Sequence, residues 1–189
     1  MSWRTVDIVV TAAIAVAFGV VYWAWGVLFT GTTAAFAFLP PAQYILSGVW
    51  LIAGVLAGLI VRKPGAALFA ETVAASVSIL LGSPWSLDVA LSGLYQGAGA
   101  ELAFAIFRYR RWDLMAAILA AALAAVGEWL HDIPLYFPAT PFPEQLLIGV
   151  FMLVSALLFA GFGTWWLFRA LVQTGVLAQF PAGRSQQRI

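Results

Sequence analysis

The sequence contains no cysteine, one lysine and one histidine, and charged residues make up only 9% of its 189 positions. The absence of cysteine excludes disulfides, thiol nucleophiles, covalent haem attachment and cysteine-ligated metal sites. The single lysine, Lys63, stands at the edge of an apolar run, which excludes a retinal-type Schiff base in mid-span. The chain also lacks a G-x-x-x-x-G-K-[ST] phosphate loop, so it cannot hydrolyse ATP by that route.

Hydrophobic residues make up 63% of the chain and charged residues only 9%. Soluble domains, by comparison, carry roughly 25% charged residues. Crossing a hydrocarbon core of ~30 Å takes about 20 apolar helical residues. Six apolar runs approach this length, at residues 6–29, 43–61, 66–82, 88–107, 113–131 and 145–171. The sequence therefore predicts an all-α polytopic membrane protein, a six-transmembrane-helix bundle in a single domain over residues 1–189. Its third span is short.

The nine basic residues fall before the first run, between runs, or at and after the end of the last run. They are Arg4, Arg62, Lys63, Arg108, Arg110, Arg111, Arg169, Arg184 and Arg188. In a bundle with an even number of spans, all of them lie on one side of the membrane. Because positively charged loops stay in the cytoplasm, this distribution predicts that both termini are cytoplasmic.

The first two runs carry small residues at helical spacing. Ala13 and Ala17 lie at i and i+4 in the first run, and Gly54 and Gly58 do so in the second. Small side chains let helix backbones approach closely in lipid, so each pair predicts a helix contact. For Ala13 and Ala17 the contact is either inside the bundle or with a partner protein. Tyr22, with two nearby tryptophans, is expected at the outer interface, where amphipathic rings prefer to lie.

Two longer connectors on the outer side are rich in aromatic residues. Residues 30–43 carry no charge, and residues 133–144 contain four prolines. A loop of this length in a small domain is often functional, and proline stiffens the backbone. We expect the first connector to form a lid and the second a rigid wall at the mouth of the bundle.

Carboxylates within the apolar runs are candidates for a binding site, because a charge in hydrocarbon costs at least ~3 kcal/mol. Glu71 shares a helical stripe with Ala75 and Ser78. It is either a ligand contact or a buried carboxylate bonded to nearby hydroxyl groups. In the fourth run, Gln96 and Glu101 point about 140° apart. We assign Gln96 to a pocket, and Glu101 either to its floor or to an interhelical bond.

Further polar and aromatic candidates lie at the outer ends of the runs. Trp85 follows a proline and is either an interfacial anchor or a stacking platform for a ligand. Glu128, His131 and Asp132 are helical neighbours. These residue types could hold a metal ion, but one histidine with two acids is more typical of a solvated ion-pair cluster, so we expect no metal. Trp129 could add a ring to an outward pocket.

All of these candidate groups belong to the outer half or the interior of the bundle, and none of them is a lysine or an arginine. Carboxylates neutralise a cation, and an indole face adds ~1–2 kcal/mol when desolvated. The inventory therefore favours an aromatic cation as ligand and disfavours an anion. The predicted substrate-binding residues are Glu71, Trp85, Gln96, Glu101, Glu128 and Trp129.

Three segments resemble one transporter family. KPGAALFAE, LLGSPW and LSGLYQGAGAELAFAIFRYRRW, all within Lys63–Trp112, are similar to YkoE-type substrate-binding (S) components of energy-coupling factor (ECF) vitamin transporters. The resemblance implies a prokaryotic cell-membrane subunit that captures thiamine or its hydroxymethylpyrimidine moiety from outside. It also implies a transmembrane coupling (T) component and two ATPase domains on other chains. The chain itself would need no cofactor, and ATP would be used only by these partners.

The resemblance also bears on Ala13 and Ala17, because an alanine-x-x-x-alanine face of the first helix meets the coupling protein in related S components. This pair matches that pattern. The alternative function is an autonomous proton-coupled secondary transporter in which Glu71 and Glu101 relay protons. The chain shows no H-E-x-x-H motif and no spacing typical of a Ser/His/Asp triad, so we expect no enzymatic activity. We expect the bilayer as surroundings and no nucleic-acid partner.

Overall fold

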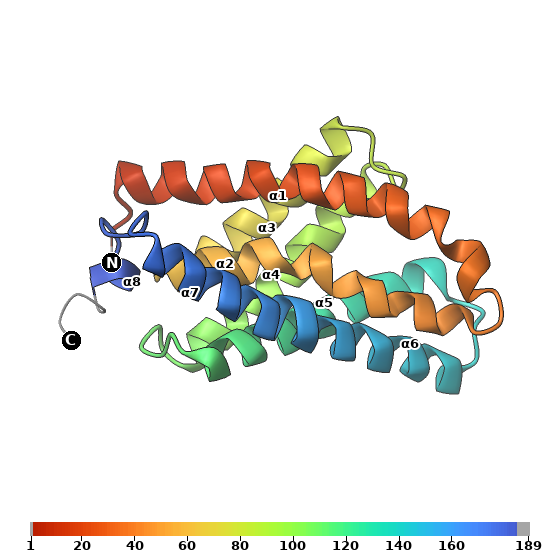
Figure 1. The fold of residues 1–189 in the computed structure, drawn as a ribbon. Coiled ribbons are helices and arrows are strands. Elements are labelled where there is room, and N and C mark those ends of the chain that lie inside the picture. Colours follow the sequence, from red (N-terminus) through yellow and green to blue (C-terminus); the bar gives the residue numbers. More distant parts are fainter. Residues whose placement is uncertain (1, 185–189) are drawn as a thin grey trace.

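In the computed structural model, which describes residues 2–184, every regular element of the described chain is a helix (Figure 1). The elements are α1 (Thr5–Gly31), η1 (Thr33–Phe36), η2 (Pro40–Leu51), α2 (Ile52–Val61), α3 (Ala66–Leu80), α4 (Asp88–Ile106), α5 (Leu114–Tyr136), α6 (Phe142–Ser155), η3 (Ala156–Gly163), α7 (Thr164–Gln173) and α8 (Pro181–Arg184). The segments η1 and η2 are 3₁₀ helices and η3 is a π-helix. The predicted all-α class is confirmed.

Five helical segments of the described chain are long and apolar enough to cross a membrane. They are α1, η2 with α2, α4, α5, and the continuous run of α6, η3 and α7. The remaining predicted run, residues 66–82, corresponds to α3, which is apolar but has only 15 residues. At 1.5 Å per residue it is about 22 Å long, short of a ~30 Å core. A sixth crossing therefore stays a prediction.

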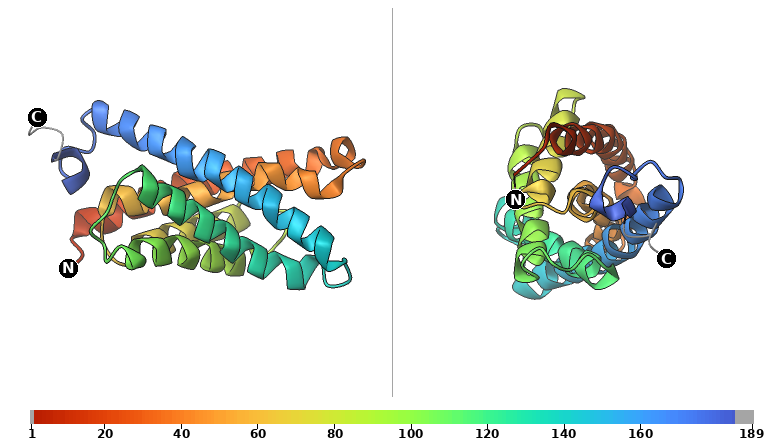
Figure 2. Two further views of the ribbon diagram at one scale, coloured as in Figure 1. Left: turned by 90° about the horizontal axis from the view of Figure 1, so that it is seen from below. Right: turned by 90° about the vertical axis from the view of Figure 1, so that its left-hand side faces the viewer.

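The second span lies inside the bundle. In its most apolar window 72% of the residues are buried, against 28% in α1. Residues 53–61 are all buried, and a helix that is hydrophobic on every side is typical of such an interior position. The end-on view in Figure 2 shows this orange-to-yellow segment surrounded by the other helices. Among these, α4 packs along both α3 and α5, and α1 packs on α3.

Glycines bring several helices into close contact. A Cβ atom on Gly99 of α4 would lie 2.1 Å from the carbonyl oxygen of Leu123 in α5, so any larger residue would push these helices apart. On the predicted small-residue face of α2, a Cβ on Gly54 would lie 3.0 Å from Glu71, and one on Gly58 would lie 2.2 Å from the Phe104 ring. The tight packing predicted for this pair is confirmed.

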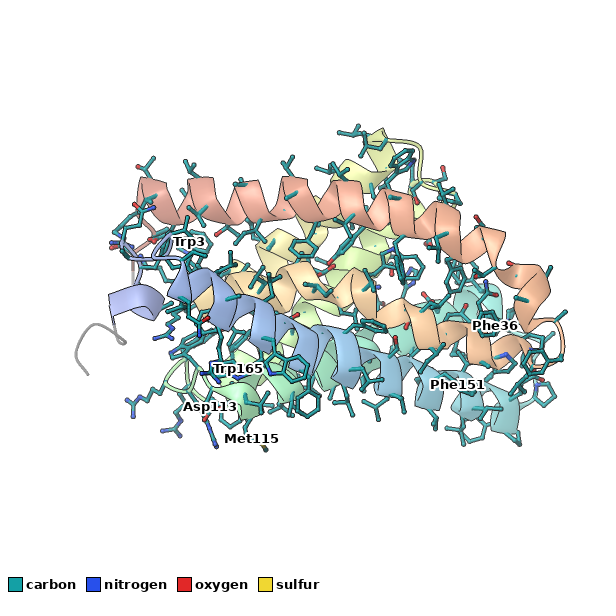
Figure 3. All side chains as sticks on the ribbon, viewed as in Figure 1. Trp3, Phe36, Asp113, Met115, Phe151 and Trp165 are labelled. Atoms are coloured by element: carbon teal, nitrogen blue, oxygen red, sulfur yellow. The ribbon has the colours of Figure 1, made fainter. Side chains whose placement is uncertain are left out.

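The basic residues before α7 gather at one end of the bundle, which we call the basic end. Trp3 Nε1 donates to the carbonyl of Pro64 at 3.1 Å, and Lys63 pairs with the buried Asp7. The start of α1 and the short helix α8 lie at this end in Figure 1, and in Figure 3 Trp3 and Asp113 lie there while Phe36 lies at the opposite end. Arg188 lies outside the described residues.

Two spans depart from α-helical geometry at positions where they touch. The 3₁₀ helix η2 runs for 12 residues and the π-helix η3 for 8, although 3₁₀ runs longer than 3–4 residues are uncommon. The two segments pack against each other. Close to this contact, a Cβ on Gly48 would lie 2.3 Å from the backbone oxygen of Ser155, at the end of α6. The two segments with irregular helical geometry are therefore in direct contact inside the bundle.

Candidate functional site

A cavity of about 230 Å³ lies inside the bundle, toward the end opposite the basic end. It is bounded by α1, η2, α3, the α3–α4 loop, α4 and α5. Its lining residues are Tyr22, Phe29, Tyr44, Trp50, Ala75, Ser78, Ser83, Trp85, Asp88, Val89, Ser92, Gln96, Glu128, Asp132 and Tyr136. Aromatic rings, carboxylates and an amide converge on it, and no lysine or arginine lines it. This is the candidate site.

One wall of the cavity is aromatic. The ring of Phe29 on α1 packs 5.7 Å from Tyr44, 5.2 Å from Trp50 and 5.8 Å from Trp85, measured between ring centroids. Trp50 and Trp85 meet edge to face at 86°. Such pairs add ~0.5–1.5 kcal/mol beyond their burial, so the wall is held in shape by its own contacts. Trp85, predicted as an anchor or a stacking platform, lies in this wall.

The lining of the cavity also carries three carboxylates. Glu128, Asp132 and Asp88 line the cavity, and His131 lies beside them, bonded to Asp132 at 2.8 Å and to Asp88 at 3.2 Å. The hydroxyl of Tyr136 donates to the second oxygen of Asp88. Only a protonated imidazole can donate from both ring nitrogens, so this geometry suits an imidazolium between two carboxylates.

The prediction of a solvated ion-pair cluster is wrong, because the cluster is buried. The side chain of His131 is 3% exposed, and Glu128 and Asp132 are buried as well. The α4–α5 packing that covers them brings in Asp88 from a distant part of the sequence, which helical spacing alone could not indicate. The described histidine, aspartate and glutamate side chains form no group of three arranged to hold a metal ion.

Tyr22, which lines the cavity, and Glu71, which does not, bond to backbone amides of the central span where η2 meets α2. Glu71 lies one turn from Ala75 of the cavity wall, and its Oε2 accepts bonds from the Tyr22 hydroxyl at 3.1 Å and from the Gly54 N–H at 2.7 Å. The same hydroxyl accepts from the Ala53 N–H at 2.9 Å. These amides lie where η2 gives way to α2, so their usual partners are missing.

This arrangement changes the expectation for both residues. The interfacial position predicted for Tyr22 is wrong, because its side chain reaches inward to the helix break and is only 4% exposed. Glu71 is a buried carboxylate, bonded to a phenol and a backbone amide instead of the serine and threonine hydroxyls considered. Its Oε1, like Oε2 of Glu128, makes no hydrogen bond within the described chain. Glu128 lines the cavity, so its Oε2 could accept a hydrogen bond from a ligand there, whereas Glu71 does not line it.

Gln96 and Glu101, which the sequence places on different faces of α4, lie in different places. Gln96 lines the cavity and donates to Ser92 at 3.0 Å. Glu101 lies at the basic end, where it accepts from the N–H groups of Gly65 at 2.7 Å and Ala67 at 3.0 Å. These contacts match the interhelical bond that was one of the two alternatives for Glu101. Glu101 does not line the cavity, so it does not form the floor of the pocket.

Glu101 also fixes the turn between α4 and α5. It accepts from the Tyr109 hydroxyl at 2.8 Å, and burial together with this hydrogen bond raises the pKa of Tyr109 to about 12. Its carboxylate caps the positive N-terminus of α3 at the same time. Glu101 therefore links the turn before α3 to the turn after α4 at the basic end. Its contacts indicate a structural role.

The remaining predicted residues lie outside the cavity. Trp129 of α5 donates its indole N–H to the Gln145 carbonyl of α6 at 2.9 Å and packs on Gly149 of the same helix. These contacts hold α5 against α6. Ala13 and Ala17 are exposed on the outer face of α1. They make no close packing inside the bundle, so their docking to a partner stays a prediction. Three aromatic wall residues, Phe29, Tyr44 and Trp50, and the carboxylate of Asp88 were not predicted.

Comparisons with known proteins agree with this architecture. A family model described as the permease component of ABC-type cobalt transport systems matches residues 6–127. The chain is similar to a Bacillus subtilis (strain 168) protein named HMP/thiamine permease protein YkoE, with 36% identity over 190 residues, 99% of this chain and 94% of that one. It is also similar to a crystal structure of an S-component of an ECF transporter. That likeness has a TM-score of 0.93 and 32% identity, and it covers 99% of this chain and 94% of the other.

Proposed function

Because the chain belongs to the family of substrate-binding (S) components of ECF transporters, we propose that its cavity captures thiamine or the hydroxymethylpyrimidine moiety of thiamine. The relative whose name includes thiamine is similar over nearly the whole chain. Capture of a small solute fits a membrane-embedded cavity that is walled by side chains from four of the membrane-length spans and from α3.

The composition of the cavity is the observation that carries this proposal. Six aromatic side chains and three carboxylates line the cavity, with no lysine or arginine in the lining. Thiamine offers a flat aminopyrimidine, whose amino group donates hydrogen bonds, and a cationic thiazolium ring. Indole and phenol rings suit the flat faces, and carboxylates suit the donors and the positive charge.

The size of the cavity also supports a small heterocycle. Its volume of about 230 Å³ lies below the ~300–1,000 Å³ typical of sites for drug-sized ligands. The unpaired Oε2 of Glu128 is buried, and a buried acceptor without a partner costs ~1–3 kcal/mol. A ligand that donates a hydrogen bond there would recover this free energy.

We place the basic end in the cytoplasm, since basic residues concentrate on that side of membrane proteins. The cavity then lies toward the outside of the cell membrane, where a capture subunit meets its solute. Uptake would use a T component and two ATPase domains on other chains, and the exposed Ala13–Ala17 face of α1 is the proposed contact with the T component. ATP would be consumed only by those partners.

A fluorescence titration tests the substrate. The detergent-purified chain contains nine tryptophans, two of which line the cavity. We expect saturable quenching by thiamine or by hydroxymethylpyrimidine at submicromolar concentration, which corresponds to a free energy of binding beyond about −8 kcal/mol. A monodisperse, helical sample that responds to neither compound would refute thiamine-type capture and leave the family assignment standing.

A further inference from the structure

The long 3₁₀ helix η2 carries two of the aromatic residues of the cavity. Tyr44 and Trp50 are six residues apart, both line the cavity, and both contact the single ring of Phe29. They therefore lie on one face of η2. Most natural 3₁₀ segments end after 3–4 residues, so a 12-residue run that carries half of an aromatic wall calls for a physical reason.

Helical geometry supplies that reason. A 3₁₀ helix has 3.0 residues per turn, so residues i and i+6 point in the same direction after two full turns. An α-helix has 3.6 residues per turn, and the same two residues would then point about 120° apart. If η2 were α-helical, either Tyr44 or Trp50 would leave the cavity. The aromatic wall depends on the 3₁₀ form.

A hydroxyl group from another span holds one turn of η2 in this form. Ser155, at the end of α6, donates to the carbonyl of Ile45 at 2.6 Å and accepts from the N–H of Gly48 at 2.8 Å. These are the two groups, i and i+3, that close a 3₁₀ turn. An α-helix would instead pair the Ile45 carbonyl with residue 49. Ser155 is completely buried, and the absence of a side chain on Gly48 lets the two backbones touch.

We propose that Ser155 is a positioning residue for the binding site, which keeps η2 in the 3₁₀ form and thereby presents Tyr44 and Trp50 together to the ligand. This inference rests on the proposed capture of a thiamine-type compound for its affinity measurements. Ser155 does not line the cavity, so it acts on the ligand only through η2.

The first test compares two removals of the same oxygen atom. Ser155→Ala deletes the hydroxyl that bridges Ile45 and Gly48. The control, Ser76→Ala, deletes a hydroxyl that bonds to a carbonyl of its own helix, Thr72, at 2.8 Å. We expect Ser155→Ala to weaken thiamine binding about tenfold or more and Ser76→Ala to change it less than about twofold. Equal losses in both variants, or no loss in Ser155→Ala, would overturn the proposal.

A double-mutant cycle separates positioning from general loosening of the core. Trp50→Leu should weaken binding strongly in the parent chain, because it removes a ring from the wall. In the Ser155→Ala background the same change should cost clearly less, because the ring no longer faces the cavity as it does in the parent. If the two losses simply multiply, Ser155 does not act through Trp50 and the proposal fails.

A measurement without ligand makes the inference independent of the substrate. Hydrogen exchange of the backbone amides in residues 43–51 reports on the turn itself. We expect Ser155→Ala to change exchange in this segment while exchange in α4 and α5 stays as in the parent, and Ser76→Ala to leave the segment unaltered. Unchanged exchange in residues 43–51 of Ser155→Ala would overturn the positioning role. If the parent chain binds neither thiamine nor hydroxymethylpyrimidine, the proposed function fails while this arm still decides the role of Ser155.

Discussion

A few single side-chain oxygens, each bonded to a backbone amide of the central span, help to determine how the helices of this bundle pack. Tyr22, Glu71 and Ser155 all direct side-chain oxygens at amides of the central span. In lipid, no water is present to take over such a bond, so each missing partner is costly. The interior of the bundle is therefore specified by a few oxygen atoms as well as by its many alanine contacts.

Removal of the Tyr22 hydroxyl should destabilise the protein. Tyr22→Phe leaves the buried N–H of Ala53 without its partner and takes one donor from Glu71. We expect a loss of about 1–3 kcal/mol in the free energy of unfolding, seen as a lower melting temperature in detergent. Tyr95→Phe is the control, since Tyr95 is 42% exposed and its hydroxyl makes no hydrogen bond in the described part of the chain. A melting temperature equal to that of the control would contradict this account.

Gln96 is the predicted pocket amide whose removal should affect binding directly. It lines the cavity with its amide bonded to Ser92. Gln96→Ala should weaken thiamine binding by about 1–3 kcal/mol if a buried polar partner of the ligand is lost. Titration calorimetry or fluorescence quenching measures the change. An affinity equal to that of the parent chain would exclude Gln96 as a ligand contact.

Sequence reasoning at this scale named only some of the residues that meet in the cavity. Trp85, Gln96 and Glu128 line it together, and their contact with a ligand stays a prediction. Tyr44 and Trp50 were missed because residues six apart point in different directions on an α-helical template. Nothing in the sequence signals 12 residues of 3₁₀ helix. The backbone contact of Gly48 with Ser155, at the end of α6, imposes this geometry from outside the segment.

At the scale of the helical element, the sequence patterns were more informative. Each of the six apolar runs became a helix, and the Pro64–Gly65 turn separates α2 from α3 as its residues indicate. The prediction left open where Glu101 belongs, because the glycine face of α4 could meet either a cavity or another helix. Packing decides this, since Gly97 brings α4 against Leu68 of α3. Glu101 then lies at the start of that helix.

Glu101 should thus affect stability and not binding. Glu101→Gln keeps the size of the side chain but replaces one acceptor oxygen with a donor amide, and it removes the charge that caps α3. We expect a lower melting temperature with thiamine affinity unchanged. Parallel thermal denaturation and ligand titration of the variant check both parts. A specific loss of affinity in a variant of normal stability would return Glu101 to the binding site.

The exposed alanines of two helices offer a matched pair of substitutions. Ala13→Leu enlarges the proposed docking face of α1, and Ala98→Leu makes the same change at an exposed position of α4. If small residues allow close approach of the coupling protein, Ala13→Leu should spare ligand binding and reduce both uptake and recovery of the complex, with Ala98→Leu near normal. Normal assembly of Ala13→Leu would place the interface elsewhere.

At the scale of the whole molecule, composition and the resemblance to S components together gave the class of protein. The relatives are a permease and a transporter component, so the prediction of a transport subunit without enzymatic activity is confirmed. They do not favour the alternative of an autonomous secondary transporter. The side of the membrane on which each end lies depends on charge, which acts during insertion and leaves no mark on the packing of the helices.

The absence of cysteine makes this orientation directly measurable. Any introduced cysteine is the only thiol in the chain. We expect Phe38→Cys, at a position that is 83% exposed, to react with a membrane-impermeant maleimide added to intact cells, and Arg110→Cys to react only after the membrane is opened. The unsubstituted chain is the control for background. The reverse pattern would place the basic end outside.

The length of α3 has a consequence for the membrane itself. A 15-residue apolar helix cannot match a bilayer core of ~30 Å, and a mismatch of this kind is relieved by local thinning of the lipid at a cost of fractions of a kcal/mol per Å. If α3 crosses the membrane as predicted, the protein carries a patch of deformed bilayer beside it. A second protein that shared or covered this patch would reduce the deformed area, so the elasticity of the lipid would favour association without any added contact between side chains.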